Sequence, residues 1–135
     1  MKIQRVNEPL TISNDFAHIL ETVINKLGVD TAKGVLVNFS DPGYETEESE
    51  NHPMEITVSK EGLVLHIIER VTVKKGIFEK LDYTVNFDIK IETYFQWGHE
   101  CGRETANILL ELIIVEVLAQ RYNTGIYQES VRPLK

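Results

Sequence analysis

The chain has 135 residues, of which 42% are hydrophobic and 26% charged, and this ordinary globular composition excludes an intrinsically disordered chain. The length suits one core, so we expect residues 1–135 to form a single domain. The net charge is −7, from 14 basic and 21 acidic residues, and five of the acidic residues fall within residues 41–50. Such a local negative charge disfavours nucleic acid as a partner and favours a cation or a basic protein.

The cysteine count and the chain start both indicate a cytoplasmic protein. Cys101 is the only cysteine, which rules out an internal disulfide and favours a reducing compartment. The opening MKIQRVNEPL has no apolar core of a signal peptide. The longest apolar stretch, residues 106–119, is interrupted by Asn107, Glu111 and Glu116 and is too short to span a bilayer. We therefore expect no membrane association.

The segment after Ser13 or Asn14 predicts an amphipathic helix. Either residue is a good N-cap, and Gly28 suits the position after the last turn. The apolar residues between them recur at helical spacing: Phe16, Ile19, Leu20, Val23, Ile24 and Leu27.

Residues 34–92 predict four strands. A short buried strand over 34–40 leads into Asp41-Pro42-Gly43-Tyr44, which suits a type II turn. Strands over 54–60 and 63–73 are joined by a tight turn. The strand over 81–92 alternates throughout, with these residues predicted to face inward: Leu81, Tyr83, Val85, Phe87, Ile89 and Ile91.

A second helix is predicted over residues 102–122, followed by a last strand over 125–131. The apolar residues of this helix cover most of its circumference, so it is either sandwiched centrally or offers a second face to another subunit. The predicted order is α-β-β-β-β-α-β. We expect an α+β fold, with an antiparallel sheet of about five strands and two helices packed on it.

The acidic segment 41–50 has three interpretations. Clustered carboxylates can bind calcium, but the EF-hand pattern is absent. The segment can also dock a basic partner. Runs of like charge are most often solvated, and we favour that interpretation. His52 precedes Pro53, which favours an extended backbone, and we expect His52 to hold one of the acidic carboxylates rather than to transfer protons.

Residues 95–104, FQWGHECGRE, combine His99 and Cys101 near a predicted helix start. This pattern is compatible with an activated thiol or a soft-metal site. A small buried cysteine is the commoner outcome, and we expect Gly98 and Gly102 to turn the chain from strand to helix. Trp97 is expected to anchor the core or to line a groove.

His66 is expected to be half-buried and hydrogen-bonded on a face with Val64 and Ile68, and His18 to be exposed. No nucleotide-binding, hydrolase or zinc motif is present, which favours a non-enzymatic protein without a cofactor.

Four stretches together resemble the bacterial family called domain of unknown function 2787: VNFSDPGYETEESENHPMEI, LDYTVNFD, FQ before a helix that opens with GRE, and YNTGIYQESV. The resemblance covers roughly residues 34–131. The second helix departs from it, because its apolar residues stand where the family tends to carry aromatic and polar ones. The resemblance implies no activity. The residues that carry it are Asn38, Phe39, Asp41, Pro42, Tyr44, His52, Pro53, Glu55, Phe95, Gln96, Gly102, Arg103, Glu104, Gly125 and Tyr127.

Three functional hypotheses follow. The first is a non-enzymatic accessory or protein-interaction domain that forms a homodimer through the second helix. The second is a small-molecule or cation-binding domain that combines the rim of loop 38–55 with the turn at 95–103. The third, an enzyme using His52, Asp41 or Glu55 as acid or base, is the least favoured. The candidate binding or loop-organising residues are Asn38, Asp41, Tyr44, His52, Glu55, Gln96 and Arg103, with none assigned as catalytic or as a metal ligand.

Overall fold

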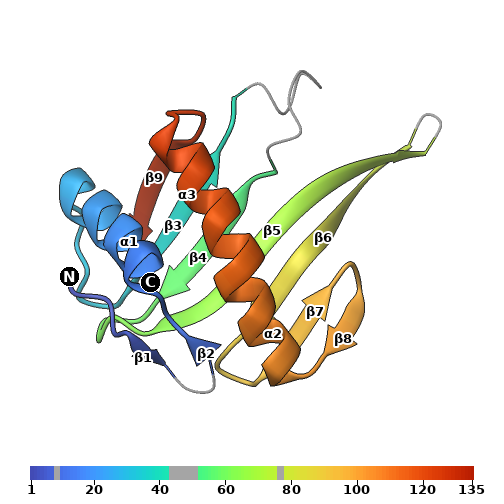
Figure 1. Ribbon diagram of the computed structural model, residues 1–135. Helices are drawn as coiled ribbons and strands as arrows, with labels where there is room; N and C mark the ends of the chain where they lie inside the picture. The colour runs from blue at the N-terminus through green and yellow to red at the C-terminus, as the bar shows by residue number, and fades with distance from the viewer. Residues whose placement is uncertain (8–9, 43–51, 76–77) are drawn as a thin grey trace.

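The computed structural model describes residues 1–7, 10–42, 52–75 and 78–135 (Figure 1). Its main feature is a seven-stranded antiparallel sheet with the order β8-β7-β6-β5-β4-β3-β9. Two short strands near the N-terminus, β1 (Val6–Asn7) and β2 (Leu10–Thr11), form a separate pair. The strands of the main sheet are β3 (Val35–Ser40), β4 (Met54–Val58), β5 (Val64–Lys75), β6 (Phe78–Asp88), β7 (Thr93–Gln96), β8 (His99–Cys101) and β9 (Gln128–Pro133).

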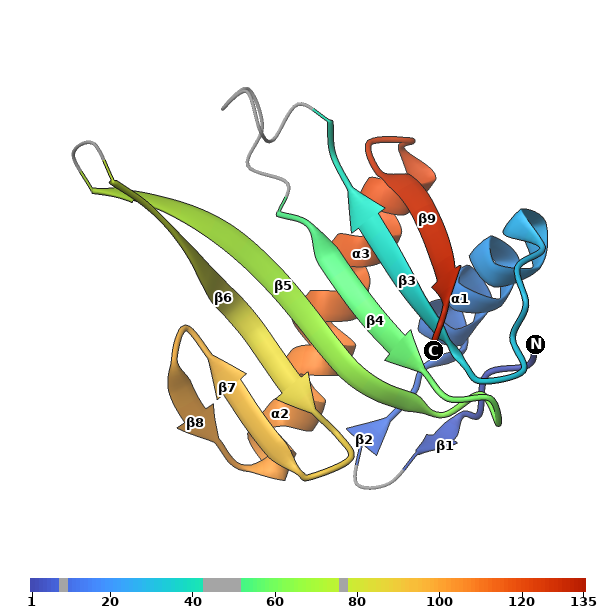
Figure 2. The ribbon, with the colours of Figure 1, turned by 180° about the vertical axis from the view of Figure 1, so that it is seen from behind.

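The helices lie on one face of this sheet. Helix α1 (Asn14–Leu27) packs beside a long second helical segment, which consists of α2 (Arg103–Leu109), the π-helical turn η1 (Leu110–Ile114) and α3 (Val115–Asn123). Figure 2 shows the sheet in front of the helices when the molecule is seen from behind. The predicted α+β class is confirmed, although the sheet has more strands than the five expected. No helix of the described residues has the length and apolar character needed to cross a membrane.

Helix α1 forms as its sequence predicts. The Ser13 side chain accepts a hydrogen bond from the backbone N–H of Phe16 at 3.2 Å, which satisfies a free donor of the first turn. Gly28 ends the helix with φ of 62°, a left-handed conformation that glycine adopts at little cost. The residues buried on its inner face are Phe16, Ala17, Ile19, Leu20, Val23 and Ile24.

The core lies between the helices and the inner face of the sheet. Phe39 and Phe87 are fully buried strand residues of this core, and Leu110 and Leu118 are its fully buried residues from the second helical segment. The helix predicted over 102–122 is thus confirmed as a continuous helical segment from Arg103 to Asn123, with a π-helical turn in its middle.

Strand β6 departs from the predicted alternation. Glu69 pairs with Val85 and Arg70 pairs with Tyr83, which leaves Thr84 as an extra residue in a β-bulge. Thr84 and Val85 are consequently both buried, whereas Tyr83 is exposed, so the inward prediction for Tyr83 was wrong. The inward prediction for Ile91 was also wrong: β6 ends at Asp88, and Ile91 is 65% exposed. The side chains of residues 71–82 lie outside those the structure describes.

A second irregularity, between Thr57 and Val58, changes the face on which β5 places its residues. Val64 is fully buried, whereas His66 and Ile68 are half-exposed, so His66 does not share a face with Val64 as predicted. The prediction that His66 is half-buried and hydrogen-bonded is confirmed, because its Nε2 lies 2.6 Å from Oδ1 of Asn86.

The segment 95–104 is the main structural difference from the sequence prediction. It was expected to be a loop into the second helix, but it forms the β7–β8 hairpin before Gly102 starts α2. In the described residues β5 and β6 also continue pairing beyond β4 and β7, as a long two-stranded ribbon (Figure 1).

Candidate functional site

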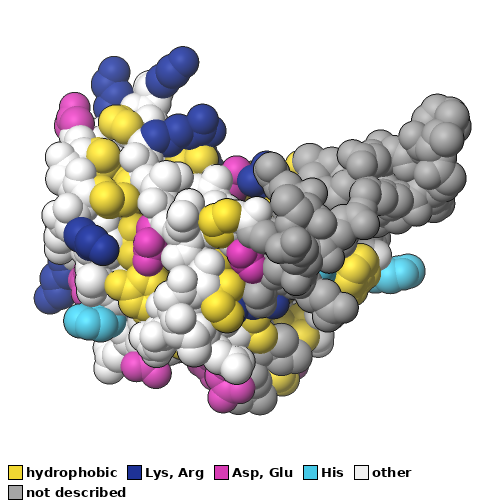
Figure 3. Space-filling view, turned by 90° about the horizontal axis from the view of Figure 1, so that it is seen from above, with side chains coloured by type: hydrophobic (Ala, Val, Ile, Leu, Met, Phe, Trp, Pro, Cys, Tyr) yellow, Lys and Arg dark blue, Asp and Glu magenta, His cyan; other side chains and the backbone are white. Residues whose placement is uncertain are grey.

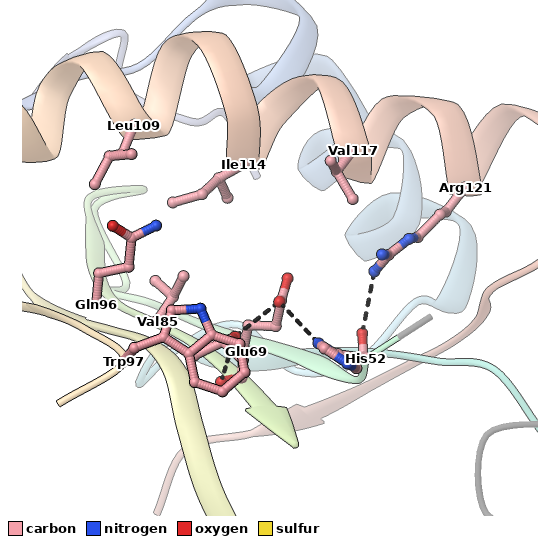
Figure 4. Close-up of a pocket in the computed structure, with 10 residues that line it drawn as sticks. His52, Glu69, Val85, Gln96, Trp97, Leu109, Ile114, Val117 and Arg121 are labelled. Atoms are coloured by element: carbon pink, nitrogen blue, oxygen red, sulfur yellow. Dashed lines mark hydrogen bonds and ion pairs between the residues drawn. The ribbon is translucent and has the colours of Figure 1, made fainter. Parts of the chain in front are cut away.

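A pocket of about 230 Å³ lies between the second helical segment and the inner face of the sheet (Figure 4). Its floor comes from the middle of β5 and β6, one side from the β7–β8 turn, and its roof from α2, η1 and α3. The residues that line it are His52, Glu69, Thr84, Val85, Gln96, Trp97, Leu109, Ile114, Val117 and Arg121.

Three of these residues form a hydrogen-bonded cluster on the floor. Nδ1 of His52 lies 3.2 Å from Oε1 of Glu69, and the Thr84 hydroxyl lies 2.7 Å from the same oxygen. The Glu69 and His52 side chains are 16% and 22% exposed, so the cluster is only partly open to solvent. It fixes the position of the carboxylate from two sides.

The β6 bulge explains why Thr84 can take part in this cluster. Without the extra residue Thr84 would face the outer side of the sheet, because neighbouring strand residues alternate. The bulge turns Thr84 inward, 3% exposed, opposite the inward-facing Glu69. A β-bulge beside a polar pocket is a common way to redirect a side chain toward a functional site.

A second set of hydrogen bonds ties helix α3 to the segment before β4. Nη1 of Arg121 donates to the hydroxyl of Tyr127 at 2.5 Å, and that hydroxyl donates to the backbone oxygen of His52 at 2.7 Å. The guanidinium also lies 5.6 Å from the centre of the Tyr127 ring. Burial raises the pKa of Tyr127, which keeps its hydroxyl a donor near neutral pH, although the hydrogen bond from Arg121 opposes this shift.

Gln96 and Trp97 reach the pocket from the β7–β8 hairpin. Gln96 pairs with His99, which leaves Trp97 and Gly98 as a two-residue turn. Both turn residues have positive φ, 51° and 77°, and this combination is characteristic of a type I′ turn. Asn and Gly are the residues that such a turn favours. A tryptophan there is strained, and its side chain is also 57% exposed.

The roof of the pocket is apolar. Leu109, Ile114 and Val117 point down from the helical segment toward Val85 on the floor (Figure 4). The π-helical turn η1 lies between Leu109 and Val117, and such turns are frequent at functional sites because they shift side chains out of the regular helical pattern.

The structure brings two of the predicted site residues together and separates the others. His52 and Gln96 line the same pocket. Asn38 and Glu55 pair with each other on the outer face of the sheet, where Glu55 forms an ion pair with Arg70 at 2.8 Å. Arg103 is exposed at the start of α2 and does not line the pocket.

The remaining site predictions concern the acidic segment. Asp41 is described and half-buried, whereas Tyr44 and the acidic residues at 45–50 lie outside the described residues, as do Gly43 and the second half of the predicted type II turn. Among the described residues, His52 lies next to the carboxylate of Glu69, a strand residue that the sequence did not single out.

The thiol hypothesis loses support. Burial raises the pKa of Cys101, whereas an activated thiol requires a lowered pKa. Its side chain is only half-buried, between β7 and the start of α2. Among the described residues no group of three His, Cys, Asp or Glu side chains could hold a metal ion.

Glu69, Thr84 and Arg121 line the pocket but were not predicted as site residues. Glu69 and Thr84 belong to strands that read as ordinary alternating segments, and Arg121 lies in the last turn of a helix, where a basic residue is common. Tyr127 was included only in the family resemblance. Trp97 had been considered as a groove residue, and its positive φ could not be predicted from the sequence.

The same α+β architecture is found in two solved structures of hypothetical proteins from Vibrio cholerae. One is VC0508 from the VSP-II pathogenicity island, with a TM-score of 0.75, 18% identity, and coverage of 97% of this chain and 99% of that one. The other is VC1805 from pathogenicity island VPI-2, with a TM-score of 0.70, 22% identity, and coverage of 94% and 100%. That protein is described as sharing structural homology with the human P32 protein. At these identities the likeness concerns the fold alone.

The chain belongs to the family described as protein of unknown function (DUF2787), whose model matches residues 14–131. This confirms the resemblance seen in the sequence and extends it over helix α1. No curated protein matches the chain.

Proposed function

We propose that this chain is a non-enzymatic binding domain for a small organic molecule, which it holds in the pocket between α3 and the sheet. The observation that carries this proposal is Trp97. A bulky residue with positive φ costs stability, and such strain is retained mainly at functional sites. Here the strain places a large, mostly exposed aromatic side chain at the edge of a pocket. Both features are expected if Trp97 contacts a ligand.

The pocket has the composition of a small-molecule site. Such sites combine apolar walls with a few fixed polar groups, and here Leu109, Ile114 and Val117 supply the wall. Glu69, held by His52 and Thr84, supplies a positioned polar group. The volume of about 230 Å³ is below the range of about 300–1,000 Å³ of pockets for drug-sized molecules. The expected ligand is therefore smaller than a typical drug.

Trp97 also makes the proposal easy to test, because it is the only tryptophan in the chain. Its indole N–H gives a single resonance in a proton–nitrogen NMR spectrum. We would add pools of small cellular metabolites and follow this resonance. We expect at least one pool to shift it together with the resonances of Gln96 and Thr84.

A matched pair of variants provides the control. Val117→Phe fills the pocket from its roof, whereas Glu116→Phe adds the same ring at the adjacent, exposed position. The shift should disappear in the first variant and persist in the second, with both proteins folded by their NMR spectra. If no pool moves the indole resonance, or if Val117→Phe leaves the shift intact, this function is wrong.

A second candidate is an accessory domain that acts through protein contacts and forms a homodimer through the second helical segment. The observation in its favour is Ile108, which is 57% exposed on α2. If this candidate is correct, Ile108→Lys should convert a dimer to a monomer, as measured by light scattering after size exclusion. Glu111→Lys should leave the dimer intact. A wild-type protein that is monomeric at all concentrations would contradict this candidate.

A basic protein is the partner that the acidic segment 41–50 would suit. On the face shown in Figure 3, Lys and Arg side chains gather mainly at one corner, while Asp and Glu side chains lie dispersed among hydrophobic ones. The described surface on that face is thus mixed in charge. On this face the described residues form no uniformly acidic surface, so the proposal of a basic partner rests on the acidic segment, most of which lies outside the described residues.

A further inference from the structure

We propose that the pocket selects a planar organic cation with several N–H donors, such as an amidinium or a guanidinium group, and that Glu69 is the residue that selects it. This inference rests on the proposed function and specifies the chemistry of the ligand. It follows from which hydrogen-bonding groups of the pocket are already used by the protein and which are not.

Glu69 has one oxygen in use and one available. Oε1 lies within hydrogen-bonding distance of both His52 and Thr84. In Figure 4 the other oxygen, Oε2, points up into the pocket, and none of the described residues donates to it. A carboxylate can accept about four hydrogen bonds, so half of its capacity remains for a ligand.

The guanidinium of Arg121 lies at the His52 end of the pocket, and its Nη1 is already in use. Arg121 donates to Tyr127 at 2.5 Å, lies 3.4 Å from the backbone oxygen of His52, and is directed toward that end of the pocket (Figure 4). Its position against the Tyr127 ring further holds it in place. The pocket therefore offers a ligand a partly free carboxylate, while Nη1 of the guanidinium ties helix α3 to Tyr127 and to the backbone of His52.

Gln96 and Trp97 extend the same preference. The Gln96 side chain reaches toward the pocket in Figure 4, and no described residue hydrogen-bonds to its amide, so its oxygen can accept a second N–H. Trp97 lines the same pocket as Glu69. An aromatic ring and a carboxylate in one pocket attract a cation by two effects, which are the charge pair and the cation–π interaction.

The apolar roof strengthens this selection. Leu109, Ile114 and Val117 limit the access of water, and a lower local dielectric strengthens a contact between opposite charges. A flat ligand also fits the restricted volume. The planar N–H edge of an amidinium matches a carboxylate oxygen and an amide oxygen better than a tetrahedral ammonium does.

The test uses three probes of almost equal shape and different charge: benzamidine (cationic), benzamide (neutral) and benzoate (anionic). Each is titrated into the intact protein while the fluorescence of Trp97 is recorded. We expect benzamidine to bind at least about tenfold more tightly than either of the others, as one charged hydrogen bond allows. Glu69→Gln should remove this preference, whereas Glu111→Gln, which changes an equal charge on the exposed side of η1, should keep it.

The outcomes separate this inference from the function on which it rests. Equal or tighter binding of benzamide or benzoate overturns the cation preference but supports a small-molecule pocket. Failure of all three probes to change Trp97 fluorescence overturns the inference, and the metabolite screen then decides the function independently. A preference for benzamidine that persists in Glu69→Gln removes Glu69 as the selecting residue.

A guanidinium can also belong to an arginine side chain of a partner protein. To distinguish this source from a free small molecule, a fourth probe, the blocked arginine N-acetyl-arginine methylamide, is titrated in the same way. If it binds more tightly than benzamidine in wild type and loses binding in Glu69→Gln, the cation class is confirmed and the source is an arginine side chain of a partner, which contradicts the proposed free ligand.

Discussion

The imidazole of His52 lies 3.2 Å from the carboxylate of Glu69, across the open end of the β4–β5 hairpin. The backbone fixes this relationship as well, because the N–H of Arg70 donates to the oxygen of Pro53 at 3.0 Å. The side-chain contact therefore joins two segments that the sheet already holds close together, and it faces the pocket rather than the outer face.

His52→Ala should lower the free energy of unfolding by about 1 kcal/mol, the usual contribution of one hydrogen bond, because the imidazole contact with Glu69 is lost. The backbone oxygen that accepts from Tyr127 remains. The matched control is His66→Ala, which removes a similar half-buried imidazole contact, to Asn86, on the outer face. Urea denaturation should show similar losses for both variants. Only His52→Ala should weaken benzamidine binding, and equal weakening by both would contradict the site.

Trp97→Asn should stabilise the fold by about 1 kcal/mol, because asparagine tolerates the left-handed conformation that tryptophan adopts under strain. Little packing is lost, since the side chain is 57% exposed. Ligand binding, followed by NMR of Thr84, should be lost. Glu92→Asn is the control, because Glu92 also has a positive φ, 55°, but lies outside the pocket. It should stabilise the protein without affecting the ligand; a stabilised Trp97→Asn protein that still binds would contradict the role of Trp97.

Tyr127→Phe should destabilise the protein by about 1–3 kcal/mol, because it removes the hydroxyl that links Arg121 to His52 inside the protein. Tyr94→Phe is an informative comparison. The hydroxyl of Tyr94 is buried, and among the described residues it has no hydrogen-bond partner, so its removal should be neutral or stabilising. Thermal melts of the two variants should therefore differ in sign or clearly in size. Equal losses of stability in the two variants would show that the hydrogen bonds of the Tyr127 hydroxyl do not stabilise the fold.

Glu21 should make stability depend on acid pH. Its hydrogen bonds with Arg5, at 2.8 and 3.1 Å, lower the pKa of Glu21 below its ordinary value of 4.5, assisted by the backbone N–H of Ile3 and opposed by burial. Because the folded-state pKa is the lower one, this stabilisation is present above pH 4.5 and is lost as pH falls through the folded-state pKa. Glu21→Gln should thus be destabilised at pH 7, and its difference from wild type should shrink below pH 4.5.

The control for this prediction is Glu116→Gln, at an exposed helix position. It should leave the acid part of the stability curve unchanged. If the difference between Glu21→Gln and wild type were constant from pH 7 to pH 3, the ion pair with Arg5 would not be the cause of the effect.

The helices and the sheet class could be predicted from the sequence because local signals decide them. Ser13, Gly28 and the apolar spacing between them are sufficient for α1. The β7–β8 hairpin escaped prediction because its turn has a tryptophan where Asn or Gly is usual. A sequence pattern detects a turn by its preferred residues, so a strained turn is read as an ordinary loop.

The candidate site was predicted only in part, for a different reason. His52 and Gln96 were found because the family resemblance and their polar character pointed to them. Glu69 and Thr84 face the pocket because of how β5 and β6 pair, with an extra residue at the bulge. Pairing register depends on the partner strand, and the alternation of one strand cannot reveal it.

The pairing of β3 with β9 has a consequence for how the chain folds during synthesis. These strands are neighbours in the sheet, yet β4 to β8 and the second helical segment separate them in the chain. Until β9 leaves the ribosome, one edge of β3 has unpaired backbone groups, which can recruit a strand from another nascent chain. We would therefore expect folding intermediates that lack β9 to depend on chaperones, and the last long-range contact to be the slow step of folding.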